Sequence, residues 1–165
     1  MKTQTSMKPI LLYGTESCHK TQLYKNWLGE NNVPFLFKDI SDEEVGNKLS
    51  ELYDGKAKHF PTLVVGNKRL RNPSTTEISK WLLNESIRQL PDSYSELSYM
   101  TKKYSVLKNY FNKGQSTKVF AKELGGNDII SFNFYRTKSG NYLKPCEMPK
   151  RKVLDFLLNY KQLKK

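Results

Sequence analysis

The sequence predicts an α/β fold over the first half of the chain and a small α+β region over the second half. In the first half, short apolar runs that end in turn residues alternate with segments of helical periodicity. The charge also changes, from 12 Lys or Arg against 9 Asp or Glu up to Asn84 to 16 against 7 from Glu85 onward. Turn-forming residues at 90–93 mark a linker, so we expect one domain over residues 8–88 and a basic domain over residues 89–165.

The first domain is predicted to begin with a buried strand over residues 9–13, followed by a helix that ends near Gly29. The apolar residues Leu23, Trp27 and Leu28 have the spacing of one helix face. The remaining elements are a strand over residues 33–40, a helix opened by a capping box of Ser41 and Glu44, a hairpin of strands over residues 60–65 and 68–71, and a helix opened by a capping box of Ser74 and Glu77. The helix between the first two strands makes them parallel, whereas the hairpin is antiparallel. A mixed sheet with helices on both faces is therefore expected.

The second domain is predicted to consist of helix, hairpin and helix. Apolar and aromatic residues from Tyr94 to Phe111 follow helical spacing, and residues 117–124 suit a short second helix. Alternation over residues 129–136, a turn, and a return through residues 142–144 predict a hairpin. Pro149 suits the first turn of a terminal helix.

The composition argues against several classes of protein. No run approaches the roughly 20 apolar residues of a membrane span, and the first residues lack the apolar core of a signal peptide. Two distant cysteines, Cys18 and Cys146, are not the framework of a disulfide-stapled secreted domain. The four Cys and His residues also lack the spacing of a metal site. We expect a cytoplasmic protein with no bound metal; the sequence does not indicate its oligomeric state.

Cys18 is the candidate reactive group because it lies between the first strand and the first turn of a helix. Unsatisfied N–H groups and the helix dipole favour the thiolate there, and the thiolate is the nucleophilic form. The hydroxyl of Thr21, one turn along, and the charges of Lys20 and Lys25 are expected to favour it further. The alternative is a cysteine that serves as a small apolar filler.

Residues 8–86 resemble a glutaredoxin of the monothiol C-x-x-T type, within the thioredoxin fold. The resemblance is carried by Tyr13 five residues before Cys18, by the motif Cys18-His19-Lys20-Thr21, and by Phe60-Pro61 ahead of an apolar strand. It implies that Pro61 is cis and that Tyr13, Phe60 and Pro61 line a cleft beside the sulfur. A thiol or disulfide substrate would pair there with the backbone ahead of the proline.

This sequence departs from the family pattern at several positions. Thr21 stands where a dithiol enzyme has its second cysteine, so a disulfide within the motif is excluded. Arg71 replaces a glycine, and Ser74 and Thr75 replace the acidic residues that help to hold glutathione in the family. A charge at Arg71 and the N–H groups after Ser74 are our candidates for binding a glutathione carboxylate. Cluster-carrying monothiol glutaredoxins have C-G-F-S instead, and a glutaredoxin-type arsenate reductase is a further alternative.

The basic second domain leaves two questions open. Cys146 is either a resolving thiol for a mixed disulfide on Cys18 or a packed, inert cysteine. The segment rich in Tyr and Lys between Tyr99 and Lys113 suits single-stranded nucleic acid, but the spacing of its rings is more simply that of a packed helix face with lysines on the solvent side.

The function predicted from the sequence is a thiol–disulfide oxidoreductase that uses Cys18, with Thr21 supporting the thiolate. Its partners would be a disulfide or glutathionylated substrate, and glutathione as co-substrate. The alternative is a non-catalytic thioredoxin-fold binding module whose basic half contacts a protein or a nucleic acid.

Overall fold

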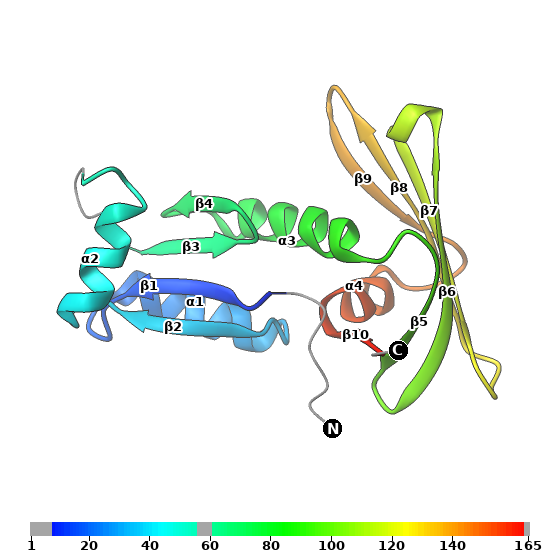
Figure 1. Ribbon diagram of the computed structural model, residues 1–165, viewed down its shortest axis with the longest axis horizontal. Helices are drawn as coiled ribbons and strands as arrows, with labels where there is room; N and C mark the ends of the chain where they lie inside the picture. The colour runs from blue at the N-terminus through cyan, green and yellow to red at the C-terminus, as the bar shows by residue number, and fades with distance from the viewer. Residues whose placement is uncertain (1–7, 56–60, 164–165) are drawn as a thin grey trace. The chain divides into compact units, whose positions relative to one another are not determined.

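The computed structural model describes residues 8–55 and 61–163 and divides the chain into two compact units (Figure 1). The first unit is Lys8–Glu85 and the second includes Ser86–Lys165, so the division falls inside one long helix. None of the helices in the described ranges has the length and apolar content needed to cross a bilayer.

The first unit contains a four-stranded mixed sheet. Its elements in chain order are β1 (Ile10–Gly14), α1 (His19–Glu30), β2 (Phe35–Asp39), α2 (Glu43–Glu51), β3 (Thr62–Val65), β4 (Lys68–Arg71) and α3 (Thr75–Gln89). The strand order is β2-β1-β3-β4, with β1 parallel to β2 and antiparallel to β3, and with β3 antiparallel to β4. The predicted succession of strands and helices, and the mixed character of the sheet, are therefore present.

Helices cover the two faces of this sheet. Tyr13 points to the face where α2 packs, in a buried cluster with Ile40, Leu49 and Tyr53. Successive side chains of a strand point to opposite faces, so Leu12, which is fully buried, points to the other face. The helix α1 contacts β1 on this second face, where Thr21 packs against Gly14, the residue after Tyr13. Both faces are therefore shielded from solvent.

Two local predictions in this unit are wrong. The buried face of α1 is formed by Thr21, Tyr24 and Leu28, whereas Leu23, which was expected to face the sheet, is 49% exposed. The reason is the close packing of Thr21 against the backbone of β1, which fixes the rotation of the helix. The N-cap of α2 is Asp42, one residue after the predicted Ser41.

The capping oxygens explain where the helices α2 and α3 begin. Asp42 Oδ1 accepts a hydrogen bond from the N–H of Val45 at 3.1 Å. Ser74 Oγ accepts one from the N–H of Glu77 at 3.1 Å, as the predicted cap requires. Each bond satisfies an N–H that the first turn of a helix otherwise leaves unpaired.

The second unit is built on a six-stranded antiparallel sheet. Its elements are β5 (Ser93–Tyr99), β6 (Lys102–Phe111), η1 (Asn112–Gly114), β7 (Ser116–Glu123), β8 (Ile129–Thr137), β9 (Gly140–Pro145), α4 (Lys150–Asn159) and β10 (Lys161–Gln162). The order is β10-β5-β6-β7-β8-β9. The predicted hairpin and terminal helix are confirmed, but the helices predicted over residues 94–111 and 117–124 are strands.

The error has a physical origin in the pattern of residues 94–111. Apolar residues there recur at spacings of three and four, which one helix face and two strand faces accommodate equally. In the structure Tyr104 and Val106 are buried on one face, and Leu107 lies on the other, 43% exposed. Lys108 interrupts the alternation of apolar and polar residues that is typical of a strand, because this charged residue occupies a buried position with 1% of its side chain exposed.

The Lys108 side chain is satisfied by groups just after α3. Its ammonium donates to the carbonyl oxygen of Leu90 at 2.6 Å and lies 2.9 Å from Asp92 Oδ1. Tyr110 donates to the same Asp92 oxygen at 2.7 Å. The hydrogen bonds from Tyr110 and Lys108 lower the pKa of Asp92. A buried ammonium is tolerated because it is both paired and hydrogen-bonded.

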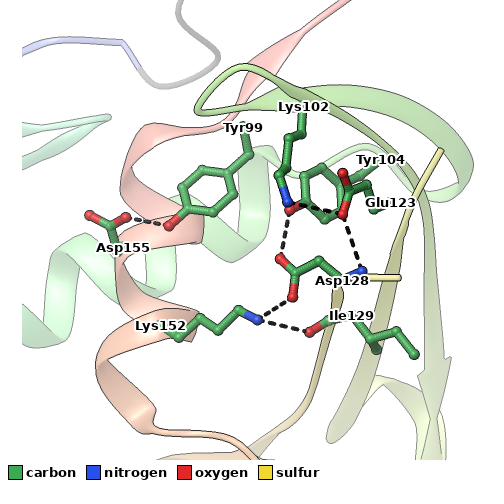
Figure 2. A network of polar contacts seen from close by, with 8 residues as sticks. All are labelled: Tyr99, Lys102, Tyr104, Glu123, Asp128, Ile129, Lys152 and Asp155. Carbon is green, nitrogen blue, oxygen red and sulfur yellow. Dashed lines mark hydrogen bonds and ion pairs between the residues drawn. The ribbon is translucent and has the colours of Figure 1, made fainter. Parts of the chain in front are cut away.

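The helix α4 is fixed to one face of the six-stranded sheet by a polar network (Figure 2). Tyr104 donates to Asp128 Oδ2 at 2.7 Å, and Lys152 of α4 pairs with the other oxygen of this carboxylate. Tyr99 donates to Asp155 of α4. Burial, and then the carboxylate that each hydroxyl meets, raise the pKa values of Tyr99 and Tyr104. Both phenols are therefore held in the neutral, donating form.

Candidate functional site

Cys18 lies where the predicted site requires it, at the start of α1. It is the N-cap of the helix, with φ −79° and ψ 116°, and its thiol is free and half-buried. The Cys18 carbonyl oxygen accepts the N–H of Gln22 at 3.1 Å, and its own N–H donates to the carbonyl oxygen of Thr15 at 3.2 Å. These bonds fix the backbone on both sides of the sulfur.

The surroundings of Cys18 favour its thiolate. The backbone N–H of Thr21 makes the largest contribution to lowering the pKa of the thiol, followed by the Thr21 side chain. Burial opposes them with a smaller effect than either contribution of Thr21, and the N–H and the charge of Lys20 lower the pKa further by smaller amounts still. The N–H groups of a first helical turn are directed at whatever occupies the N-cap position, which here is a sulfur atom.

Thr21 acts mainly through its backbone. Its side chain is fully buried against Gly14, and among the described residues its hydroxyl has no hydrogen-bond partner of normal geometry. The hydroxyl is thus near the sulfur but not well aligned with it. This agrees with the order of the contributions to the pKa of Cys18, in which the Thr21 N–H comes first.

Lys25 does not contribute to the field at the sulfur as predicted. Its ammonium is 2.6 Å from Glu16 Oε1 and 3.4 Å from the ring centroid of Phe37. The hydrogen bonds from Lys25 and then Gln22 lower the pKa of Glu16, so this carboxylate stays charged and neutralises the lysine. The three side chains instead hold the loop ahead of Cys18. Lys20 is the cation that remains for the thiolate.

Tyr24 belongs to the site although it was not among the predicted site residues. It is buried on the same side of α1 as Thr21, one turn along, and its hydroxyl donates to the Pro73 carbonyl oxygen at 2.6 Å. Burial raises the pKa of Tyr24, and the charges of Cys18 and Glu77 raise it further. The start of α1 and the start of α3 therefore lie close together. The signal available in the sequence was the spacing of three residues from Thr21.

This contact also brings the predicted binding residues of α3 to the Cys18 end of the sheet. Ser74 directly follows Pro73, and Thr75 is the first residue of α3. Their place at a helix start leaves backbone N–H groups available to an anionic group. Pro61 is buried just ahead of β3, and its carbonyl oxygen accepts the N–H of Asn72 at 3.0 Å. Phe60 lies outside the described residues.

Tyr13 and Arg71 lie together, but on the face of the sheet that α2 covers. They are aligned across the strands through Thr62, which pairs with Tyr13 in β1 and with Arg71 in β4. The Arg71 guanidinium carbon is 4.2 Å from the ring centroid of Tyr53. Tyr13 is only 6% exposed, so packing in the core accounts for most of its surface. The predicted residues thus form two groups, one beside Thr21 and one beside Tyr53.

Cys146 lies in the second unit, directly after β9. Its N–H donates to the carbonyl oxygen of Ser131 at 2.9 Å, and its sulfur accepts a hydrogen bond from Asn133 Nδ2 at 3.6 Å. The thiol is half-buried and free. Within residues 8–55 and 61–163, no three His, Cys, Asp or Glu side chains are grouped as metal ligands.

Comparisons with known proteins give one structural likeness. No family model matches the chain, and no curated protein matches it. A crystal structure of a variant of the thioredoxin-like protein BC3987 is similar, with 25% sequence identity and a TM-score of 0.40. The similarity covers 48% of this chain and 99% of that chain.

Proposed function

We propose that the unit Lys8–Glu85 is a glutaredoxin-like thiol–disulfide oxidoreductase that acts through the single thiol of Cys18. The observation that carries the proposal is the position of this thiol, half-buried at the N-cap of α1 with the N–H groups of Lys20 and Thr21 beside it. A thiolate stabilised in this way is a nucleophile near neutral pH. A reducing compartment such as the cytoplasm would keep it available.

The reaction consists of two thiol–disulfide exchanges. In the first, the Cys18 thiolate attacks one sulfur of a disulfide or glutathionylated substrate; a bond forms between the two sulfurs, and the other substrate sulfur leaves as a thiolate. In the second, the thiolate of an external thiol such as glutathione attacks the mixed disulfide and releases Cys18. With a glutathionylated substrate, the substrate leaves as its thiolate in the first exchange, and the second exchange joins the glutathione held on Cys18 to one external glutathione as glutathione disulfide. A disulfide substrate needs one exchange more and a second molecule of the external thiol.

The residues around Cys18 have distinct roles in this proposal. The N–H groups of Thr21 and Lys20 stabilise the attacking thiolate and make Cys18 a good leaving group in the second exchange. The start of α3 at Ser74 and Thr75 offers N–H groups to a carboxylate of glutathione. Pro61 is assigned to the cleft beside Cys18, whereas Tyr13 and Arg71 lie beside Tyr53 on the other face of the sheet and take no part in this proposal.

Cys146 enters the proposal as a second route for the release of Cys18. If its thiol attacks the mixed disulfide, a Cys18–Cys146 disulfide forms and the external thiol must then reduce it. Treatment with diamide followed by peptide mass spectrometry tests this route. A crosslinked peptide containing both cysteines supports it, and the absence of such a peptide removes it.

The experiment that tests the main proposal combines turnover with titration. Reduction of a glutathione mixed disulfide by glutathione, coupled to glutathione reductase, is measured for the wild type, Cys18→Ser and Cys146→Ser. We expect Cys18→Ser to fall to the uncatalysed rate, whereas Cys146→Ser retains most of the activity. Alkylation of Cys18 by iodoacetamide, followed by peptide mass spectrometry, should show a midpoint below the ordinary thiol pKa of about 8.5.

The opposite result favours the second candidate function. A Cys18 thiol that titrates at its ordinary pKa, together with no turnover in the wild type, would contradict the enzyme. The fold would then serve as a binding module, with the basic second unit as the part that contacts a protein or nucleic acid.

A further inference from the structure

The six-stranded sheet has one face that no helix within residues 86–163 covers. The helix α4 lies against the face that carries Tyr99, Tyr104 and Phe132 (Figure 1). We call the opposite side the open face. The strand pairings place these residues on it: Tyr94, Glu96, Ser98, Lys103, Ser105, Leu107, Asn109, Phe111, Ser116, Lys118, Phe120, Lys122, Ile129, Ser131, Asn133, Tyr135, Tyr142, Lys144 and Lys161.

The open face carries large apolar and aromatic side chains that solvent reaches. Tyr94 is 58% exposed and Tyr142 52%, and Phe111, Leu107 and Phe120 are exposed to a similar or slightly smaller extent. Tyr94, Leu107 and Phe120 form one row, because Tyr94 pairs with Leu107 and Leu107 pairs with Phe120. The two rings at the ends of this row are two strand spacings apart, about 10 Å.

The same face is strongly basic. It presents five lysines and a single carboxylate, Glu96, which accepts a hydrogen bond from Tyr94 at 2.9 Å. Lys118 and Lys122 flank Phe120 on β7, two residues to either side and on the same face. Within residues 86–163, no acidic side chain pairs with a lysine of this face; the acids that form ion pairs bind Lys102, Lys108 and Lys152.

We propose that the open face binds single-stranded nucleic acid. Unstacked bases pack on exposed aromatic rings, while the phosphates follow lysines placed beside those rings. The arrangement of Phe120 between Lys118 and Lys122 meets both needs within one strand. Asn109 and Asn133, which lie in the same cross-strand row as Lys118, offer amide groups to base edges.

The charge of the face decides between this ligand and other occupants. A second copy of the chain would bring five lysines against five lysines, which repel each other. A duplex hides the faces of its bases, so the rings of the open face would have no base to stack on. A polyanion with unstacked aromatic bases is complementary to both the lysines and the rings.

The test is fluorescence anisotropy of labelled 20-nucleotide single-stranded DNA and RNA of mixed sequence, titrated with the full chain at several salt concentrations. We expect binding that weakens with salt, with a slope of about 0.7 per phosphate neutralised. Replacing Lys118, Lys122 and Lys144 together by Gln should weaken binding about tenfold or more and reduce the slope by about 2. Replacing the same lysines by Arg should restore binding.

Two further variants test whether binding depends on the open face itself and not only on the net positive charge of the chain. Phe120→Leu, which keeps an apolar side chain but removes the ring, should weaken binding about fivefold or more. A matched control replaces the exposed Lys102, Lys150 and Arg151 by Gln, which removes the same charge from β6 on the packed face and from α4. This control should bind single strands nearly as tightly as the wild type, and far-UV circular dichroism should show that all variants are folded.

Several outcomes would overturn the proposal. These are no binding of either single strand at low salt, equal losses in the Lys118/Lys122/Lys144 variant and in the control, or binding that Phe120→Leu leaves unchanged. Dimers in analytical ultracentrifugation that Phe120→Leu dissociates would assign the face to protein association instead. The outcome is independent of Cys18, because Cys18→Ser leaves the open face unaltered.

Discussion

The two units differ in where they leave side chains available for chemistry. In Lys8–Glu85 both faces of the sheet are packed, and among its described residues the proposed reactive group is the thiol of Cys18, between β1 and α1. In the second unit one face of the sheet is packed under α4, and the other is a broad surface of rings and ammonium groups. The first unit thus has its reactive group at one position, whereas the second unit presents rings and ammonium groups across one face of a sheet.

The connections between strands account for this difference. A parallel pair such as β1 and β2 needs a crossover, and the crossover helix covers the sheet. The strands β5 to β9 are joined in succession as antiparallel neighbours by short connections, which leave a face uncovered unless another element reaches it. In the first kind of sheet a reactive group must lie at a strand end, whereas the second kind can use its whole surface.

A matched pair of phenylalanines on neighbouring strands gives the largest expected effect and tests whether the two faces of the six-stranded sheet differ in burial. Phe132 is fully buried on the packed face, and Phe120 lies on the open face with 37% of its surface exposed. We expect Phe132→Ala to destabilise the second unit by about 3–5 kcal/mol through the cavity that it leaves. Phe120→Ala should cost about 1 kcal/mol or less. Urea unfolding measures both, and equal losses would mean that the two faces are buried alike.

A second pair of variants tests how tightly the Cys18 end of the first unit is packed. A Cβ at Gly14 would collide with the Thr21 hydroxyl, so Gly14→Ala should cost about 1–3 kcal/mol and slow the alkylation of Cys18 by shifting the start of α1. Gly29, near the other end of α1, has no atom within 4 Å of such a Cβ. Gly29→Ala should therefore be neutral or stabilise by up to about 1 kcal/mol. Similar effects of the two changes on Cys18 would contradict the close contact.

The packed face of the second unit should also depend on pH. Partial burial raises the pKa of Asp128, but hydrogen bonds from Lys152 and Tyr104 outweigh it, and the pKa is lowered in the folded state. The stability that this carboxylate contributes is thus present above its unfolded pKa of about 3.9 and is lost as the pH falls through the folded value. The raised pKa of Tyr104 acts in the opposite range, because its contribution is lost as the pH rises above about 10.

Asp128→Asn tests the loss of stability that is expected at low pH. We expect it to cost about 1–2 kcal/mol at pH 7, where the wild-type carboxylate is charged, and much less near pH 3. Asp54→Asn, at an exposed turn of the first unit, should change stability little at either pH. Urea titrations at the two pH values give the comparison. A cost for Asp128→Asn that does not change with pH would show that the charge is irrelevant.

The smallest effect concerns the side chain of Thr21. Thr21→Val removes a buried hydroxyl that has no hydrogen-bond partner of normal geometry among the described residues, so stability should change by less than about 1 kcal/mol. The pKa of Cys18 should rise only modestly, because the N–H of residue 21 remains. Thr21→Ser keeps the hydroxyl and serves as the control. The pH profile of alkylation measures both, and a return of the Cys18 pKa to its ordinary value in Thr21→Val would assign the effect to the hydroxyl.

The fold of the first unit was predictable because its signals are local. Gly66, with φ 59°, turns β3 into β4, and Ser74 caps α3, so the order of elements follows from short segments. Cys18 was predictable for the same reason, since its place between β1 and α1 needs no tertiary contact. Tyr24 was not, because the rotation of α1 depends on Thr21 packing against Gly14.

The second unit was harder to predict because its pattern depends on distant partners. A lysine at a buried position is acceptable only where a carbonyl and a carboxylate reach it, and Leu90 and Asp92 lie 18 and 16 residues before Lys108. Without knowledge of those contacts, Lys108 indicates a solvent-facing position and favours a helix. Tyr99 and Tyr104 of this segment are buried under α4, so the rings proposed to stack on bases are those of the open face.

The short strand β10 has a consequence for self-association. By pairing Lys161 with Ser98 and Gln162 with Leu97, it occupies part of the outer edge of β5. At the other end of the sheet, β9 pairs with β8 alone among the described strands, and Pro145 at its end lacks an N–H to donate. Growth of the sheet by addition of a foreign strand would therefore start at β9, in its stretch ahead of that proline.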